Sequence, residues 1–232
     1  MKASLLLLLA ASSLSTVYAQ NWKEDRPVSG ITGVQVSTGI ELMLAQGGTE
    51  KLTLEATGFE KNEVKSVLKN GVLQLFIDRR NQGLSGWGRN RNVKAYLTFR
   101  QLKNIEASSG SNVRAQGRLN FGNLDMAASS GSEVELDLKA DELNLEVTSG
   151  ANTNLNGSAR TLSTRVSSGA ELEAGKLTTE VCNVQATGGA NADVYATKEL
   201  RLQASGGADV SYDGPAKVVS KQKSGGADIS KR

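Results

Sequence analysis

The fold is decided by a six-residue stretch, SSGSNV at residues 108–113, because close copies of it recur along the rest of the chain. The next copy is SSGSEV at residues 129–134, and the last is SGGADI at residues 224–229. The glycine common to all copies stands at Gly110, Gly131, Gly150, Gly169, Gly189, Gly207 and Gly226. Successive glycines are 21, 19, 19, 20, 18 and 19 residues apart. Copies at a nearly constant interval indicate a repeat architecture.

Between these glycines, apolar and polar residues alternate, as in VELDL at residues 134–138 and LNLEV at residues 143–147. A period of two is typical of strands with one buried face. A repeat of about 19 residues without a helical pattern fits one coil of a parallel β-solenoid, with a perimeter of roughly 63 Å at ~3.3 Å per residue. We therefore predict an all-β protein that stacks about seven coils over residues 106–232.

The repeat also predicts which side chains face inward. Apolar residues precede the glycine by three positions in six copies, and Lys223 takes that place in the last copy. The residues three positions after the glycine, also expected inward, include Val113, Val134, Thr153, Leu172, Val210 and Ile229. A hydroxyl row precedes the glycine by two positions: Ser108, Ser129, Thr148, Ser167, Thr187, Ser205 and Ser224. The glycine itself is expected in a sharp turn or at positive φ.

An acid–amide row follows the glycine by two positions: Asn112, Glu133, Asn152, Glu171, Asn191, Asp209 and Asp228. Amides alternate with acids until the last two copies, where two acids are neighbours. Calcium prefers several oxygen ligands, so Asn191, Asp209 and Asp228 are candidates for a cation or sugar-hydroxyl site. The alternative is a solvated edge on which alternation limits charge repulsion.

Residues 31–105 lack the regular glycines and are expected to form a more irregular β part that caps the solenoid, with residues 20–30 as an extension before it. The segment STGIEL at residues 37–42 is a degenerate copy of the repeat. Strands are predicted at residues 33–37, 41–45, 51–56, 72–78 and 93–99. Asn70-Gly71 predicts a tight turn between extended segments at residues 63–69 and 72–78. The alternative for residues 60–68 is one or two helical turns.

One basic loop is a candidate ligand site. Residues 79–91 contain Arg79, Arg80, Trp87, Arg89 and Arg91 among flexible residues. Tryptophan stacks on sugar rings or cations, and arginine binds carboxylate or phosphate in a bidentate manner. The alternative is a hairpin loop whose Trp87 folds back onto the sheet.

The first residues read as a targeting signal. A basic start, an apolar stretch and small residues at Val17 and Ala19, before the expected cleavage site, match a secretory signal peptide at residues 1–19. No later segment is apolar enough to cross a bilayer after its removal. A single cysteine, Cys182, excludes an intrachain disulfide, and we expect it to be buried.

Composition removes several classes of function. The 232 residues include no His, which excludes Ser-His-Asp and Cys-His catalysis and His-ligated zinc. A net charge of +3 from 27 basic and 24 acidic residues gives no indication of nucleic-acid binding. Glycine accounts for 25 residues and proline for only 2, so the chain is neither collagen-like nor a linker.

With the signal peptide, the repeats and the segment Gly39-Ile40-Glu41 in place, the chain resembles the putative autotransporter adhesin, head GIN domain family of exported bacterial proteins. The resemblance covers about residues 31–230, and Glu41 stands where the family's Gly-Ile-Asn has Asn. It implies a right-handed parallel β-helix outside the cytoplasm, in the periplasm, on the outer-membrane surface or outside a Gram-negative cell. It brings no catalytic residues and no cofactor.

Three classes of function follow as expectations. The first is a non-enzymatic binding module that contacts a glycan or protein of the cell surface or envelope. The second is a structural or envelope-assembly protein. The third, a polysaccharide-degrading β-helix enzyme, is the weakest, because the acids are spread along a row without a basic partner in register and fold analogy alone is a poor basis for assigning catalysis.

Overall fold

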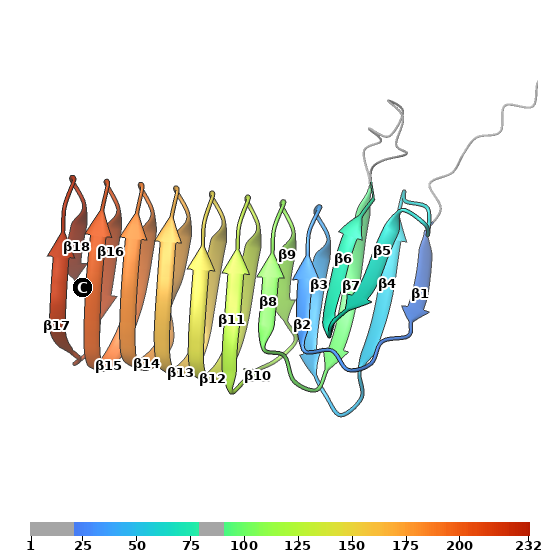
Figure 1. Cartoon of the computed structure of the whole chain (residues 1–232), viewed down its shortest axis with the longest axis horizontal. Coiled ribbons are helices and arrows are strands. Elements are labelled where there is room, and N and C mark those ends of the chain that lie inside the picture. The colour runs from blue at the N-terminus through green and yellow to red at the C-terminus, as the bar shows by residue number, and fades with distance from the viewer. Residues whose placement is uncertain (1–20, 79–90) are drawn as a thin grey trace, which may run out of the picture.

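The computed structural model describes residues 21–78 and 91–232, and every regular element in these ranges is a β-strand (Figure 1). Neighbouring strands are hydrogen-bonded into one continuous sheet that winds into stacked coils. No helix in the described ranges is long and apolar enough to span a membrane. The predicted all-β solenoid is therefore confirmed.

Each coil consists of a strand that rises to a tight turn and a strand that descends from it. The strands of the repeat region are β8 (Asn104–Ala107), β9 (Asn112–Ala115), β10 (Leu119–Asn120), β11 (Asn123–Ala128), β12 (Glu133–Val147), β13 (Asn152–Ser167), β14 (Glu171–Thr187), β15 (Asn191–Ser205), β16 (Asp209–Asp213), β17 (Lys217–Lys223) and β18 (Asp228–Lys231). Strands β12 to β15 are long because each bends and serves both sides of the coil. Their pairing is parallel, with the glycine repeats in register.

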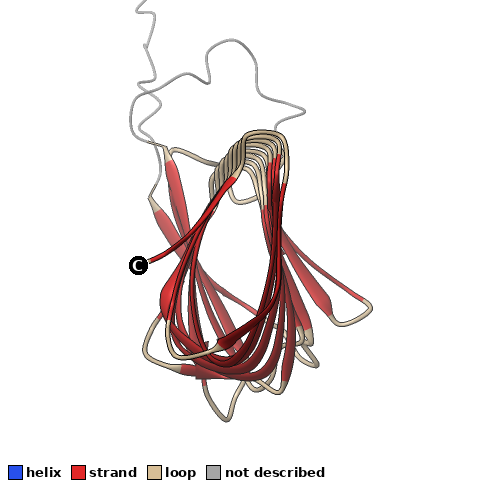
Figure 2. Ribbon diagram, turned by 90° about the vertical axis from the view of Figure 1, so that its left-hand side faces the viewer, coloured by secondary structure: helices blue, strands red, loops and turns tan. Residues whose placement is uncertain are grey.

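The strands form two faces that meet at the row of tight turns (Figure 2). The first face contains β8, β11, the C-terminal halves of β12 to β15, and β17. The second face contains β9, the N-terminal halves of β12 to β15, β16 and β18. Because strand side chains alternate in direction, each face sends one set of residues into the core and presents the other set to solvent.

The turn uses two residues with positive φ. In the first regular copy these are Ser109 at 53° and Gly110 at 68°, and the amide of Ser111 donates to the carbonyl of Ser108 at 3.2 Å. This is the pattern of a type I′ turn. Successive turns are also joined, since the Gly110 amide donates to the Ser130 carbonyl at 3.1 Å. The positive φ predicted for the glycine is confirmed, and the residue before it shares that conformation.

The last three turns have glycine at both positions, and in the last two of them the neighbouring turns lie close together. A Cβ on Gly206 would lie 3.2 Å from the amide nitrogen of Gly188, and a Cβ on Gly225 would lie 3.1 Å from that of Gly206. Both distances are tighter than ordinary van der Waals contact. These contacts favour glycine at the first turn position of the last two copies, whereas a Cβ on Gly188 would lie at an ordinary 3.4 Å from the Ser168 nitrogen.

The core contains the residues that the repeat predicted. Positions three before and three after the glycine are buried, as in Ala128 and Val134, whereas Lys223 is exposed. The position directly after the glycine is buried as well, which the sequence analysis did not predict. It holds Ser111 and Ser132, whose hydroxyls donate to backbone carbonyls, and alanine in the later copies.

The N-terminal part continues both faces and then changes direction. Its strands are β1 (Trp22–Arg26), β2 (Gly33–Val36), β3 (Glu41–Gln46), β4 (Lys51–Thr57), β5 (Val64–Lys69), β6 (Val72–Ile77) and β7 (Asn92–Phe99). Strands β2 and β3 pair in parallel with β8 and β9, so the degenerate copy at residues 37–42 is one more coil of the stack. Its turn has the same conformation, with Thr38 at φ 61° and Gly39 at φ 79°.

Antiparallel strands end the stack at this side. Strands β6 and β7 lie parallel on β2 and β3, whereas β5 pairs antiparallel with β6, β4 with β7, and β1 with β4. The predicted Asn70-Gly71 turn joins β5 to β6, and the alternative of helical turns at residues 60–68 is wrong because β5 occupies most of that segment. Strand β1 lies within residues 20–30, where no strand was predicted.

Candidate functional site

The acid–amide row is a stack of side chains in register on the second face. Asn112 pairs with Glu133, Glu133 with Asn152, and the register continues through Asn191 to Asp209 and Asp228. The Asn112 Nδ2 donates to Glu133 Oε2 at 2.8 Å, which is the amide–acid contact that alternation allows. The row therefore stacks as the repeat predicted, and amides separate most of its acids.

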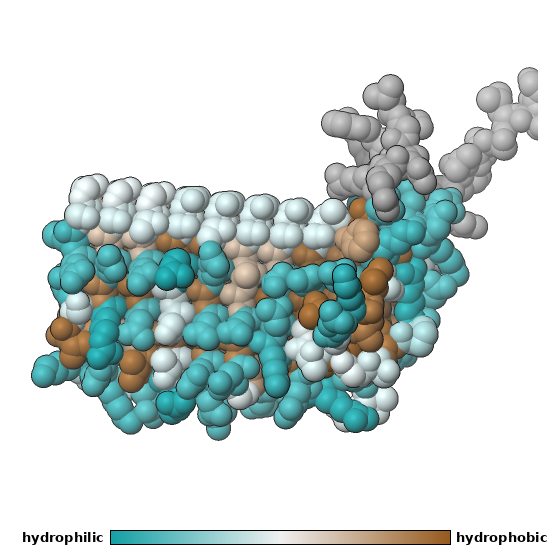
Figure 3. All heavy atoms as spheres, in the orientation of Figure 1, coloured by the Kyte–Doolittle hydropathy of each residue, from teal (hydrophilic) through white to brown (hydrophobic). Residues whose placement is uncertain are grey.

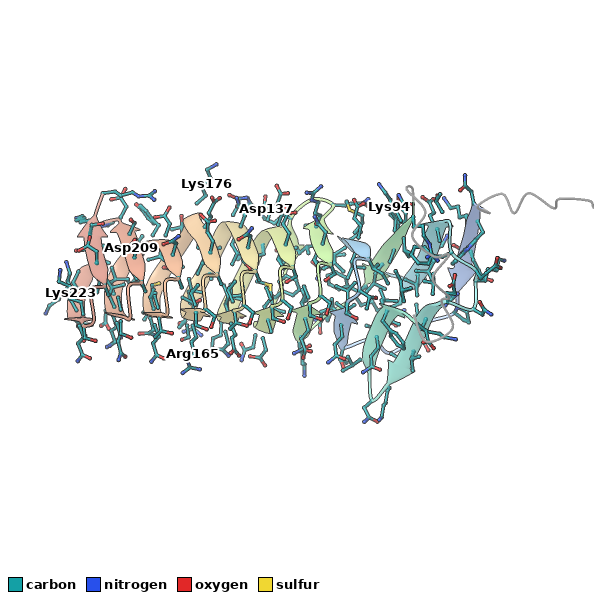
Figure 4. The ribbon with its side chains drawn as sticks, turned by 90° about the horizontal axis from the view of Figure 1, so that it is seen from above. Lys94, Asp137, Arg165, Lys176, Asp209 and Lys223 are labelled. Atoms are coloured by element: carbon teal, nitrogen blue, oxygen red, sulfur yellow. The ribbon has the colours of Figure 1, made fainter. Side chains whose placement is uncertain are left out.

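Asn191 and Asp209 lie at a hollow of about 590 Å³ on the second face. The acids at the hollow are Glu171, Glu173, Asp193, Asp209 and Asp213, and the cations are Lys176 and Arg232. Figure 4 shows Asp209 and Lys176 on the same side of the solenoid. The excess of acids and the amides of Asn154, Asn156 and Asn191 suit a cationic or hydroxyl-bearing group.

Asp193 is the least exposed acid of this hollow. Partial burial raises the pKa of its carboxyl, the Arg232 guanidinium at 2.9 Å acts against that rise, and the charges of Glu173 and Asp213 add to it. Gly175 makes room for the carboxylate, because a Cβ on Gly175 would lie 2.5 Å from Asp193 Oδ2. Arg232 thus occupies the position of a cationic ligand of Asp193.

The three candidate metal ligands do not share this hollow. Asp228 lies outside its lining and forms an ion pair with Lys223 at 3.4 Å. Within residues 21–78 and 91–232, no group of three or more Asp, Glu, Cys or His side chains is placed to hold a metal ion. Calcium binding by Asn191, Asp209 and Asp228 stays a prediction, and the geometry adds no support to it.

Of the basic-loop candidates, only Arg91 lies within the described residues; Arg79, Arg80, Trp87 and Arg89 lie outside them. The Arg91 Nε donates to the Gly58 carbonyl at 2.7 Å, and its guanidinium lies 4.0 Å from the centre of the Phe59 ring. The Arg91 guanidinium also forms an ion pair with Glu63 at 3.5 Å. These contacts favour a structural role for Arg91, and ligand binding by the loop stays a prediction.

A second hollow, of about 510 Å³, lies on the first face and was not predicted. Its lining includes a row of short polar residues, Asn104, Asp125, Asn144, Ser163 and Asn183, and a neighbouring row with Ala127, Glu146, Arg165 and Gln185. Figure 4 shows Arg165 on the side of the solenoid opposite Asp209. The sequence signal was available, because these residues recur at the repeat interval, but they stand four and six positions before the glycine, outside the six-residue stretch on which the copies were aligned.

Cys182 is buried in the core, as predicted. Burial raises the pKa of its thiol to about 12, while a hydrogen bond with Thr179 opposes the rise. A neutral, enclosed thiol is a poor nucleophile and a poor metal ligand. Cys182 therefore belongs to the packing of the solenoid.

Comparison with known proteins defines the class. Residues 30–216 match the family described as putative auto-transporter adhesin, head GIN domain, so the chain belongs to that family. No curated protein matches the sequence.

Solved structures share the fold at low sequence identity. A putative adhesin from Bacteroides fragilis is 19% identical with a TM-score of 0.82, over 92% of this chain and 97% of that one. A putative adhesin from Parabacteroides merdae is 16% identical with a TM-score of 0.70, over 92% and 96%. A putative lipid binding protein from Parabacteroides distasonis is 13% identical with a TM-score of 0.69, over 91% and 96%. At these identities the likeness concerns the fold.

Proposed function

We propose that this protein is a non-enzymatic, exported binding module that contacts an extended polymer of the cell surface or envelope. The observation that carries the proposal is the arrangement of outward polar side chains in rows that stay in register over successive coils. Such rows repeat the same contact every ~4.8 Å along a rigid body. A regular array of this kind matches a ligand that is itself regular and extended.

Family membership supports this proposal. The family and two of the structural relatives are described as adhesins, a class that acts by contact outside the cytoplasm. The predicted signal peptide at residues 1–19 agrees with export to the periplasm, the outer-membrane surface or the medium. A non-enzymatic role agrees with the absence of histidine from the sequence and with the packing role of its only cysteine.

Location and ligand class can be tested together. Fractionation of the producing cells, with protease treatment of intact cells, is expected to place the protein outside the cytoplasm. Purified protein is expected to bind isolated envelope or a polysaccharide component of it. Retention in the cytoplasm, or the release of unsaturated uronates from a polysaccharide, would contradict the proposal.

Two outcomes would assign a different kind of partner. Crosslinking that recovers one defined envelope protein, without any polysaccharide affinity, would favour the structural role. Binding to lipid vesicles would favour the property by which the Parabacteroides distasonis relative is described. Substitution of Trp87 and Arg89 by alanine tests the basic loop, and unchanged binding would remove those residues from the ligand site.

A further inference from the structure

The first face carries a groove that runs along the solenoid axis. The residues at its sides come from five successive coils, from β8 to β14. In one row Asn104 is in register with Asp125, Asp125 with Asn144, Asn144 with Ser163, and Ser163 with Asn183. Because the pairing is parallel and in register, the row follows the stacking direction. An extended ligand lying along this axis would meet one polar side chain per coil.

The groove exists because a ladder of long polar side chains is interrupted. On the N-terminal side, Gln74 Nε2 donates to Gln35 Oε1 at 2.9 Å, and Gln35 Nε2 donates to Glu106 Oε2 at 2.8 Å. The next position in register is Ala127, followed by Glu146. A methyl group between two glutamates leaves a notch and ends the chain of hydrogen bonds.

The interruption leaves polar groups without protein partners. The side chain of Glu146 makes no hydrogen bond or ion pair with any residue in the described part of the chain, although Arg165 is its direct neighbour in register. Arg165 donates through Nε to Gln185 Oε1 at 3.1 Å, which leaves its terminal nitrogens for other acceptors. The side-chain oxygen of Asn104 is buried and has no hydrogen-bond partner. A buried oxygen without a partner, such as that of Asn104 in the neighbouring row, is uncommon in folded proteins, whereas Glu146 and Arg165 are exposed to solvent.

The mixture of groups indicates the chemistry of the ligand. Amides, a hydroxyl, carboxylates and one guanidinium offer donors and acceptors side by side, and hydroxyl groups can use both. The charged residues of the lining are Asp125, Glu146 and Arg165, so the groove has no cationic row for an acidic polymer. Ala127 and the edges of Met126 and Leu145 add an apolar floor. Figure 3, which shows this face, has hydrophilic bands with hydrophobic surface between them.

We propose that this groove binds a neutral, hydroxyl-rich polysaccharide chain lying along the solenoid axis. The inference rests on the proposed binding function and deepens it. It names the face that binds, the class of ligand and the direction in which the ligand chain lies. Side chains alone make the contact, because the backbone groups of these strands already pair with neighbouring coils. The lining offers no aromatic ring for stacking, so affinity depends on contacts repeated over several coils.

The test fills the notch without disturbing the fold. Ala127→Gln extends the Gln74–Gln35–Glu106 ladder into the groove, at a position that is only half-buried. The matched control is Ser158→Gln, which places the same side chain at another partly buried strand position, outside the lining of both hollows. Affinity electrophoresis through neutral glucan, mannan and galactan, with polygalacturonate for comparison, measures binding, and thermal unfolding checks that each variant folds.

Retardation by a neutral polysaccharide is expected for the wild type and for Ser158→Gln. The Ala127→Gln protein should bind about tenfold more weakly or worse, as expected for the loss of one or two hydrogen bonds. Glu146→Gln with Arg165→Gln, which removes both charges and keeps a polar side chain at each position, should also weaken binding.

The contrary outcomes distinguish a failure of the groove assignment from a failure of the proposed binding function. If the wild type binds a neutral polysaccharide and Ala127→Gln binds equally well, the groove assignment is overturned while the binding function stands. Binding only to polygalacturonate, or only to an envelope protein, overturns the neutral polysaccharide as occupant. A wild type that binds no polysaccharide and no isolated envelope overturns both proposals.

Discussion

Two glycines with positive φ, Gly150 and Gly157, are required for different physical reasons. A Cβ on Gly150 would meet nothing within 4 Å, so only its φ of 68° disfavours other residues. A Cβ on Gly157 would overlap the carbonyl oxygen of Leu138 in the next coil. We predict that Gly150→Ala lowers the free energy of unfolding by ~1–2 kcal/mol and that Gly157→Ala lowers it by more than ~4 kcal/mol or prevents folding. Urea unfolding measures both, and equal losses would contradict the argument.

The raised pKa of the buried Cys182 thiol should make the stability of the protein depend on pH. Its pKa is about 12 in the folded protein and ~8.5 in an unfolded chain. Above the unfolded value only the unfolded state releases the proton, so stability falls as the pH rises through this interval. We expect the wild type to lose about 2 kcal/mol more than Cys182→Ala between pH 8 and pH 10. Parallel pH dependence of urea midpoints for the two proteins would show that the thiol does not contribute.

At the scale of elements, Arg26 joins the two faces at the capped end. It extends from β1, at the edge of the second face, to β5 and the segment before it, where β5 forms the edge of the first face. Its Nη1 donates to the Val64 carbonyl at 2.8 Å and to Ser66 Oγ at 3.0 Å, and its Nη2 donates to the Lys61 carbonyl at 3.1 Å. The side chain is 19% exposed. One guanidinium therefore satisfies backbone groups that neighbouring strands leave open.

We predict that Arg26→Lys weakens this end, because an ammonium cannot reproduce the forked contacts. Loss of charge-assisted hydrogen bonds should cost about 2 kcal/mol locally. Amide exchange in β1 and β5 should accelerate, while exchange in β13 and β14 stays unchanged. The control is Lys23→Ala on the same strand, since the Lys23–Glu55 pair is exposed and contributes little to stability. Similar exchange in both variants would contradict the role of Arg26.

The elements also show where sequence reasoning ends. The repeat predicted the coils, the inward positions and the acid–amide row, because strand alternation and the glycine turn are local properties. Strand β1, with the sequence WKEDR, has no apolar alternation, and only its pairing with β4 makes it a strand. Similarly, the turns at Gly39 and Gly110 are neighbours in the stack, but 70 residues separate them in the sequence. The regular repeat interval therefore could not show that they are neighbours. The groove on the first face depends on the short side chain of Ala127 between long polar neighbours. One short residue at one position of the repeat does not form a recognisable sequence motif.

At the scale of the whole molecule, the final coil has features that oppose further stacking. Lys221, Lys223 and Lys231 are in register with Leu202, Ala204 and Tyr212, which are all buried. Lysine thus occupies positions that earlier coils use for the core. Val219 is bypassed by a shift in register and is exposed. Inward charges and bulges are devices that protect sheet edges from pairing with other chains.

Removal of these charges should turn the end of the solenoid into a site of self-association. We predict that Lys221→Leu, Lys223→Ala and Lys231→Leu together produce dimers or longer assemblies that grow with concentration, because a new strand can then cover an apolar coil at low desolvation cost. Sedimentation velocity measures the change. The control replaces three exposed lysines on the outer surface, Lys139, Lys176 and Lys217, by serine. It removes the same charge, so equal association of both variants would attribute the effect to net charge, and no association of the core-position variant would show that the inward lysines do not protect this edge.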